Sequence, residues 1–260
     1  MVCSDAGAEK RRSGLNGERR RRSMIDQKTR VFVKHVKGMF QPTLLREIRA
    51  FLNKVEAERQ ALAQSERERQ AVSRGETSDA LRMDVRWYDV WRSPSSLALK
   101  TVGPFTWVVY PPQVRLVREK NHFVPWHQDI GYQKMLGPRA HKRLITCFIP
   151  IDDDPAKRTT LQFAREEMPE LKHVPMDRFG AGLENPNFKD LAQYELELGD
   201  ALVFGDLTFH RTFVPPQGIV ERRSLEFRLI QPSDALENKD YFDSKSGFFV
   251  RKDGSKREQL

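Results

Sequence analysis

The segment PWHQDIGY, residues 125–132, contains a histidine and an aspartate two positions apart, His127 and Asp129. In an extended chain, residues i and i+2 point to the same side, so an imidazole and a carboxylate can face one cavity. Both groups are ligands for divalent transition metals. A His-x-Asp triplet also arises easily by chance, so this pair alone does not establish a metal site.

A third candidate ligand and a candidate anion site follow in chain order. His210 lies in DLTFHRT, at the end of a predicted strand. Two imidazoles and one carboxylate on one face of a metal form the facial triad that suits ferrous iron and leaves positions open for a cosubstrate and oxygen. The predicted strand RRSLEFRL then carries Arg222, Ser224 and Arg228 on one face, where a guanidinium and a hydroxyl can bind a carboxylate.

The two neighbouring arginines of RRSLEFRL leave two registers open. If Arg222 points inward, Ser224 and Arg228 follow it and form a polar lining. If Arg223 points inward, leucine and phenylalanine follow it at alternate positions, as on an ordinary core face. We favour Arg222, because a cosubstrate needs polar partners and an unpaired buried arginine is costly.

Short strands behind a helical N-terminal part are expected to position these residues. Residues 30–40 predict a short strand, and QPTLLREIRAFLNKVEAERQ predicts a helix with Pro42 near its start. SPSSLALKTVG predicts a second helix, opened by Ser93 or Ser95. Six segments rich in β-branched and aromatic residues follow: FTWVVY, VRLVREK, LITCFIPI, TTLQFA, YELELGDALVFG and RRSLEFRLI. This order predicts a mainly β fold with flanking helices (α+β), either a β-sandwich or a jelly roll.

Charge is concentrated at the N-terminus of this 260-residue chain of net charge +9, since residues 1–30 hold nine Lys/Arg against four Asp/Glu. We expect residues 1–29 to be a basic, disordered tail. Residues 30–260 are expected to form one domain, with a helical front at about 42–100 and a β core at about 105–235.

Three composition features bear on location. No apolar run approaches 18 residues, so no membrane span is predicted, and the charged N-terminus is unlike a secretory signal. Two cysteines cannot make a disulfide framework and suit a reducing cytosol. We therefore expect a cytoplasmic protein, with a nuclear location as the alternative that the basic tail suggests.

Together these motifs resemble the Fe(II)/2-oxoglutarate-dependent dioxygenases, in particular the phytanoyl-CoA dioxygenase-like family. The resemblance covers about residues 30–235 and rests on WHQD, GDALVFGDLTFHRT and RRSLEFR, with LITCFIPIDDD between them. It implies a double-stranded β-helix (jelly-roll, cupin-like) core and no catalytic residue beyond the metal centre. The iron ligands that it implies are His127, Asp129 and His210. The residues that it implies for 2-oxoglutarate are Arg222 and Ser224, with Arg228 as a further candidate.

The substrate-facing wall is less well defined by the resemblance. Trp126 and Tyr132 flank His127 and Asp129, and Gln128 lies between these two ligands; all three are our candidates for substrate contacts. Many family members have an NGxLxxxPGSH segment, but RTTLQFAREEMPEL here lacks its glycine and its last histidine. Arg115 and Arg118 are expected on a solvated strand face.

The resemblance implies an oxygenase that hydroxylates, or otherwise oxidises, a C–H bond of a small molecule. Such an enzyme uses Fe(II), converts 2-oxoglutarate and O2 to succinate and CO2, and can use ascorbate as a reductant. The alternatives are a nucleic-acid or protein demethylase or hydroxylase of the same superfamily, a non-enzymatic metal-binding jelly-roll module, and a zinc hydrolase. We expect a small-molecule substrate, regard nucleic acid as a less favoured partner, and expect no membrane partner. The oligomeric state does not follow from the sequence.

Overall fold

A computed structural model describes the chain from residue 30 onward, with gaps. The described residues are 30–62, 91, 97–110, 112–118, 123–130, 143–159, 161–166, 171, 173–176, 180–183, 186–216, 218, 221–234, 240–246, 248–250 and 256–257. The predicted basic tail, residues 1–29, lies outside them. So do the candidate capping residues Ser93 and Ser95 and the candidate substrate contact Tyr132.

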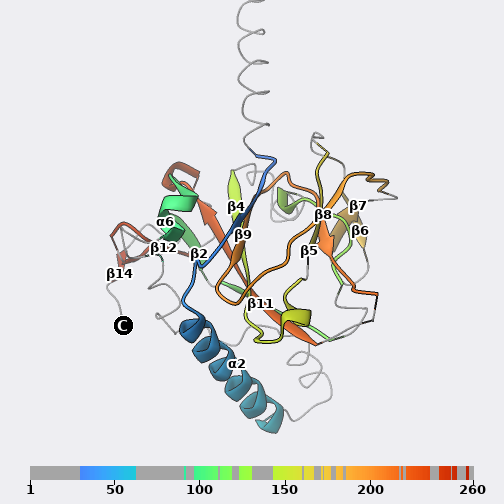
Figure 1. Cartoon of the computed structure of the whole chain (residues 1–260). Coiled ribbons are helices and arrows are strands. Elements are labelled where there is room, and N and C mark those ends of the chain that lie inside the picture. The colour runs from blue at the N-terminus through green and yellow to red at the C-terminus, as the bar shows by residue number, and fades with distance from the viewer. Residues whose placement is uncertain are drawn as a thin grey trace, which may run out of the picture.

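One strand and two helices come first in the described chain (Figure 1). They are the strand β1 (Val33–Val36), the helix α2 (Pro42–Leu62) and the short helix α6 (Leu97–Val102). Helix α2 begins at Pro42, where the missing N–H of proline costs no hydrogen bond. Its buried residues recur at three- and four-residue spacing and pack into the main core: Leu45, Ile48 and Leu52. Within the described chain, no helix is both long and apolar enough to cross a membrane.

The larger sheet contains nine strands among the described residues, in the order β1-β9-β4-β11-β2-β12-β13-β14, with β3 also paired to β11. The bounds not yet given are β2 (Trp107–Tyr110), β3 (Gln113–Val117), β4 (Leu144–Pro150), β9 (Ala201–Gly205), β11 (Arg222–Ile230), β12 (Asp240–Asp243), β13 (Phe248–Val250) and β14 (Lys256–Arg257). One face of this sheet forms the main core with α2, through residues such as Cys147, Val203 and Phe227.

A smaller sheet packs against the other face. Its strands, in the order β10-β5-β8, are β10 (His210–Thr212), β5 (Leu161–Ala164) and β8 (Leu191–Gln193). Phe148 and Phe204 of the larger sheet meet Leu161 and Phe163 of the smaller one in one buried cluster. A separate hairpin and two 3-10 turns complete the described elements: β6 (His173–Met176), β7 (Gly180–Leu183), η3 (Pro155–Lys157) and η4 (Pro232–Asp234). Two facing sheets with few helices confirm the predicted mainly β, jelly-roll class.

The strand leading to His210 differs from the prediction. Strand β9 ends at Gly205, and the chain turns there, with the Thr208 N–H donating to the Gly205 carbonyl at 3.0 Å. The chain thereby changes sheets, and His210 begins strand β10 instead of ending the strand ALVFG. The larger sheet also extends past the predicted core limit near residue 235, through β12, β13 and β14.

The start of the described chain holds this turn in place. In Figure 1 the blue strand β1 crosses beside the orange strand β9, its antiparallel partner. Gly205 N–H donates to the Phe32 carbonyl at 3.2 Å, and a Cβ on Gly205 would lie only 1.9 Å from the Arg30 carbonyl oxygen. The Arg30 guanidinium donates to Asp206 Oδ1 at 2.9 Å. Burial raises the pKa of Asp206, and the Arg30 cation opposes that rise.

Replacing Arg30 by alanine is expected to lower the free energy of unfolding by about 3 kcal/mol, because a buried carboxylate would lose its cationic partner. The Asp206 side chain is fully buried, whereas that of Arg30 is 17% exposed. Urea denaturation followed by circular dichroism measures the change. Lys34→Ala, on the same segment but exposed, is the control and should change stability by less than about 0.5 kcal/mol. Equal stabilities for the two variants would contradict a role for the Arg30–Asp206 ion pair.

Candidate metal centre and the adjoining pocket

His127 and His210 are brought together by backbone pairing. The two residues form an isolated antiparallel bridge, in which each N–H donates to the other residue's carbonyl at 3.0 Å. Their ring centroids lie 4.1 Å apart, and both side chains are buried. The bridge therefore joins the segment around residue 127 to β10 and points both imidazoles at one place.

Both imidazoles are held with the same ring nitrogen toward the site. Nδ1 of His127 lies 2.9 Å from the Pro125 carbonyl, and Nδ1 of His210 lies 3.0 Å from the Thr208 carbonyl. A carbonyl only accepts, so each Nδ1 carries the hydrogen and each neutral ring keeps its lone pair on Nε2. Burial lowers the pKa of both histidines, and neighbouring His210 lowers that of His127 further. Neutral imidazoles with Nε2 lone pairs are suited to bind a metal.

Asp129 supplies the third candidate ligand atom. Its Oδ1 lies 3.8 Å from His127 Nε2 and 3.9 Å from His210 Nε2. This buried oxygen has no hydrogen-bond partner among the residues that the structure describes. Burial alone would raise the pKa of Asp129, but the charge of Arg228 and other neighbours hold it below its usual value, so the carboxylate is ionised.

These three residues fit a metal ion. One ligand atom from each lies within 4.8 Å of the others, and all three residues are buried. A buried carboxylate oxygen without a donor costs free energy unless a cation binds to it, and Oδ1 of Asp129 is such an atom. Two imidazole nitrogens and one carboxylate oxygen are the donor set of non-heme Fe(II) sites.

Aromatic side chains from both sheets support the ring of His210. Phe204 of β9 lies with its ring centroid 4.7 Å from the imidazole, and Phe163 of β5 stacks on it at 5.9 Å. Phe163 is also the direct cross-strand partner of His210. The sequence pattern did not identify these contacts, because they depend on pairing between distant strands.

A pocket lies beside this cluster, and strand β10 contributes residues to both. It has about 280 Å³ of empty volume, including space open to solvent. Its lining residues are Arg115, Val117, Phe148, Leu161, Thr212, Arg222, Arg223 and Ser224. Thr212, which lines the pocket, stands two positions after His210 on β10, or about 7 Å along the strand, and its side chain points to the same side.

Arg222 provides the pocket's uncompensated positive charge. The residue is 5% exposed, and its guanidinium donates to the Phe213 carbonyl at 2.7 Å. No carboxylate is among its contacts in the described part of the chain. Burial lowers the pKa of Arg222 to about 10, which still leaves it a cation at neutral pH. A buried cation beside a small pocket favours the binding of an anion.

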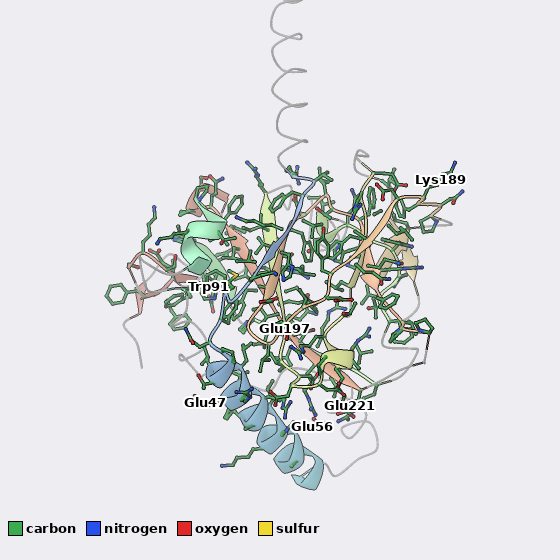
Figure 2. The ribbon with its side chains drawn as sticks, viewed as in Figure 1. Glu47, Glu56, Trp91, Lys189, Glu197 and Glu221 are labelled. Atoms are coloured by element: carbon green, nitrogen blue, oxygen red, sulfur yellow. The ribbon has the colours of Figure 1, made fainter. Side chains whose placement is uncertain are left out.

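Arg223 also borders the pocket, but its guanidinium is bound to carboxylates. It lies 2.8 Å from Glu56 of α2 and 3.5 Å from Glu221. Figure 2 labels both glutamates, which lie close together where α2 meets the sheet. On β11, Leu225 and Phe227 follow Arg223 into the main core, while Arg222 shares its face with the other polar positions. The geometry therefore matches the favoured register, in which Arg222 faces the pocket.

The other predicted site residues lie in different surroundings. Trp126 packs in an aromatic cluster, with its ring centroid 4.8 Å from that of Phe188 and 4.8 Å below the Arg211 guanidinium. Gln128 is fully buried and binds backbone, since its amide N–H donates to the Leu207 carbonyl and its amide oxygen accepts from the Leu171 N–H. These contacts indicate packing and loop positioning for both residues.

Arg228 contacts the metal cluster and is not among the residues that line the pocket. Its guanidinium donates to Asp129 Oδ2 at 2.7 Å and to Glu226 Oε2 at 3.1 Å. Arg115 was expected on a solvated face but is partly buried, with its Nε 2.8 Å from Glu226 Oε1. That expectation was wrong because Glu226 is buried on the opposing strand β11. The glutamate in the middle of RRSLEFRL, on the same face as Arg222, was the available signal.

Comparison with known proteins gives one family and several structural relatives. Residues 33–214, more than half of the chain, match the family described as phytanoyl-CoA dioxygenase (PhyH). The non-heme monooxygenase ThoJ is 14% identical over 74% of this chain and 71% of its own, with a TM-score of 0.53. The 2-oxoglutarate (alpha-ketoglutarate)-dependent epimerase SnoN from nogalamycin biosynthesis is 15% identical over 83% of both chains, with a TM-score of 0.47.

A third similar structure is EvdO2 from Micromonospora carbonacea var. aurantiaca, complexed with 2-oxoglutarate. It is 20% identical over 55% of this chain and 61% of its own, with a TM-score of 0.43. No curated protein matches this chain. The likeness to ThoJ supports the fold, while the match over residues 33–214 covers the three clustered residues His127, Asp129 and His210.

Proposed function

Because this chain belongs to the phytanoyl-CoA dioxygenase family, we propose that it hydroxylates, or otherwise oxidises, a C–H bond of a small molecule. In the hydroxylation form, 2-oxoglutarate, O2 and substrate R–H become succinate, CO2 and R–OH. One oxygen atom enters succinate and the other enters the product, so the reaction balances without a further reductant.

Membership of the family confirms three expectations from the sequence. The chain has the fold of the non-heme oxygenases, it is an oxidoreductase, and its cofactors are iron and 2-oxoglutarate. The identity of the substrate and the kind of oxidation belong to the proposal.

The buried group of His127, Asp129 and His210 is the observation that carries the proposal. Two Nε2 lone pairs and an orphan carboxylate oxygen meet within 4.8 Å, and such a set would hold Fe(II) on one face. Bound iron would supply the redox chemistry that couples O2 to oxidation of the substrate. The protein's own contribution is to keep the imidazoles neutral, the carboxylate ionised and the site shielded from water.

The neighbouring pocket supports a role for Arg222 and Ser224 in holding the cosubstrate. A small dicarboxylate bound at the metal through one end could direct its other carboxylate into this pocket, whose lining includes Thr212, two positions after His210 on β10. The fork of Arg222 and the hydroxyl of Ser224 are suited to bind that carboxylate. Arg223 is less suited, because Glu56 and Glu221 already compensate its charge.

One feature favours hydroxylation over halogenation, and another favours a small molecule over nucleic acid. Asp129 fills the position where related halogenases have a small residue that admits chloride, so a carboxylate there favours oxidation without halogen transfer. Within the described residues, the basic side chains around the pocket are largely paired with acids, as Arg115 is with Glu226. An extended basic face for nucleic acid is not evident there.

Succinate release from 2-oxoglutarate, measured with Fe(II) and ascorbate, tests the proposal. The candidate substrates are acyl-CoAs, amino acids, alkaloids, phosphonates and methylated oligonucleotides. We expect one small-molecule class to raise succinate release above the uncoupled background, with one oxidised product formed per succinate. Stimulation by oligonucleotides alone would favour the demethylase alternative, and iron binding without any 2-oxoglutarate turnover would contradict an oxygenase.

A further inference from the structure

Oxygen Oδ2 of Asp129 is bound by two donors of the chain itself. The Thr146 hydroxyl donates to it at 2.5 Å, and Arg228 Nη1 donates to it at 2.7 Å. The same Nη1 also donates to Thr146 Oγ1 at 2.5 Å, so the three groups form a closed triangle. Oδ1, in contrast, is the atom that faces both imidazoles and has no donor among the described residues.

Strand register explains why these two donors reach the same oxygen. Arg228 of β11 and Thr146 of β4 are direct cross-strand partners. Partners of this kind lie on one face of the sheet within about 5.5 Å of each other. A shift of one residue would replace Arg228 by Phe227 or Leu229, both of which pack in the main core. The pairing of β4 with β11 therefore builds this contact into the fold.

Arg228 is itself held on its other side. Its Nη2 donates to Glu226 Oε2 at 3.1 Å, and the second oxygen of Glu226 lies 2.8 Å from Arg115 Nε. The four charges alternate along the chain of contacts Arg115, Glu226, Arg228 and Asp129, so they cancel. Arg228 thus lies between two carboxylates of the protein, unlike Arg222, whose described contact is a carbonyl.

We infer that Arg228 is a positioning residue for Asp129, and not a ligand of 2-oxoglutarate as the family resemblance suggested. With Thr146 it engages Oδ2, so that Asp129 offers the metal Oδ1 alone. A carboxylate free to turn could bind through both oxygens and occupy a second coordination position. The inference rests on the proposed iron site, whose open positions must take the cosubstrate and oxygen.

Cobalt(II) binding to the full-length protein tests this role without relying on turnover. Arg228→Gln should weaken Co(II) binding by about 10- to 100-fold, the usual effect of removing a partner that orients a metal ligand. The visible ligand-field spectrum of Co(II) bound to this variant should also change, because Asp129 without its Arg228 contact could bind through both oxygens and alter the coordination number. Thr146→Val should shift affinity and spectrum in the same direction but less, and Arg228→Lys should partly restore both.

Arg211→Gln is the matched control. Arg211 follows His210 on β10, but its guanidinium lies over Trp126 and donates to Gln162, so Co(II) affinity and spectrum should stay unchanged. If Arg228→Gln binds Co(II) normally but loses affinity for 2-oxoglutarate, Arg228 is a cosubstrate ligand and the inference is wrong. If Arg228→Gln fails to fold by circular dichroism, Thr146→Val decides, and a normal spectrum there contradicts the inference. Wild-type protein that binds no Co(II) would instead overturn the proposed function.

Discussion

Replacing His210 by alanine is expected to abolish tight metal binding and all turnover of 2-oxoglutarate, because only two protein ligands would remain. Metal at 100 times its Kd should stabilise the wild-type protein by about 2.7 kcal/mol. For a domain of this size that corresponds to a rise in Tm of about 5–10 °C. His210→Ala should show almost no rise at the same concentration of Co(II) or Mn(II), and His127→Ala should behave alike.

His35 provides a control histidine outside the site. It lies 2.7 Å from Asp200 and pairs β1 with the start of β9, so His35→Ala can lower Tm without removing a metal ligand. The metal-induced rise in Tm should therefore persist in His35→Ala. A full rise in His210→Ala, or its loss in His35→Ala, would show that His127, Asp129 and His210 do not form the metal site.

The candidate triad was predictable because its signals are local or ordered along the chain. His127 and Asp129 are close in sequence, and His210 lies in a motif with a strand before it and an arginine strand after it. The structure brings the three ligand atoms within 4.8 Å. The strand that contains His210 was predicted less well. The chain changes from the larger to the smaller sheet after Gly205, and hydrophobic periodicity does not indicate such a change.

Contacts between residues on distant strands could not be predicted from the sequence. Thr146 and Arg228 both reach Oδ2 of Asp129 because they are cross-strand partners on β4 and β11. Arg115 is partly buried because it pairs with Glu226 of the neighbouring strand β11. Periodicity specifies which face of a strand is polar but not which residue of another strand it meets. Arg228 was therefore grouped with the cosubstrate residues because of the motif, whereas in the structure it contacts the carboxylates of Asp129 and Glu226 and the hydroxyl of Thr146.

The register of the neighbouring residues Arg222 and Arg223 could be predicted from the periodicity of RRSLEFRL, but the contacts of each arginine could not. Two registers were open for RRSLEFRL, and the favoured one followed from requiring a polar lining on one face and an apolar core on the other. In the structure Leu225 and Phe227 lie in the core, and Ser224 shares the pocket with Arg222. Arg223 also pairs with Glu56 of α2, which compensates its charge, and no local sequence pattern indicates this contact.

Arg222→Ala is accordingly expected to weaken 2-oxoglutarate binding severely while leaving metal binding largely intact. The loss of a charge-assisted bidentate pair in a semi-enclosed site costs about 2–5 kcal/mol, or roughly 30-fold to several thousand-fold in affinity. Arg222→Lys should restore only part of this affinity, because a point charge cannot reproduce the planar fork. Titration of the Co(II)- or Fe(II)-loaded protein with 2-oxoglutarate under anaerobic conditions measures these constants directly.

Arg223→Ala is the matched comparison, because it removes the same charge from the adjacent position. Its guanidinium is bound to Glu56 and Glu221, so its loss should reduce stability modestly and change 2-oxoglutarate affinity by less than about threefold, or under 1 kcal/mol. If Arg223→Ala severely weakens 2-oxoglutarate binding and Arg222→Ala changes it little, Arg223 is the residue that anchors the cosubstrate. If neither variant affects 2-oxoglutarate affinity, the pocket beside the metal cluster is not where the cosubstrate binds.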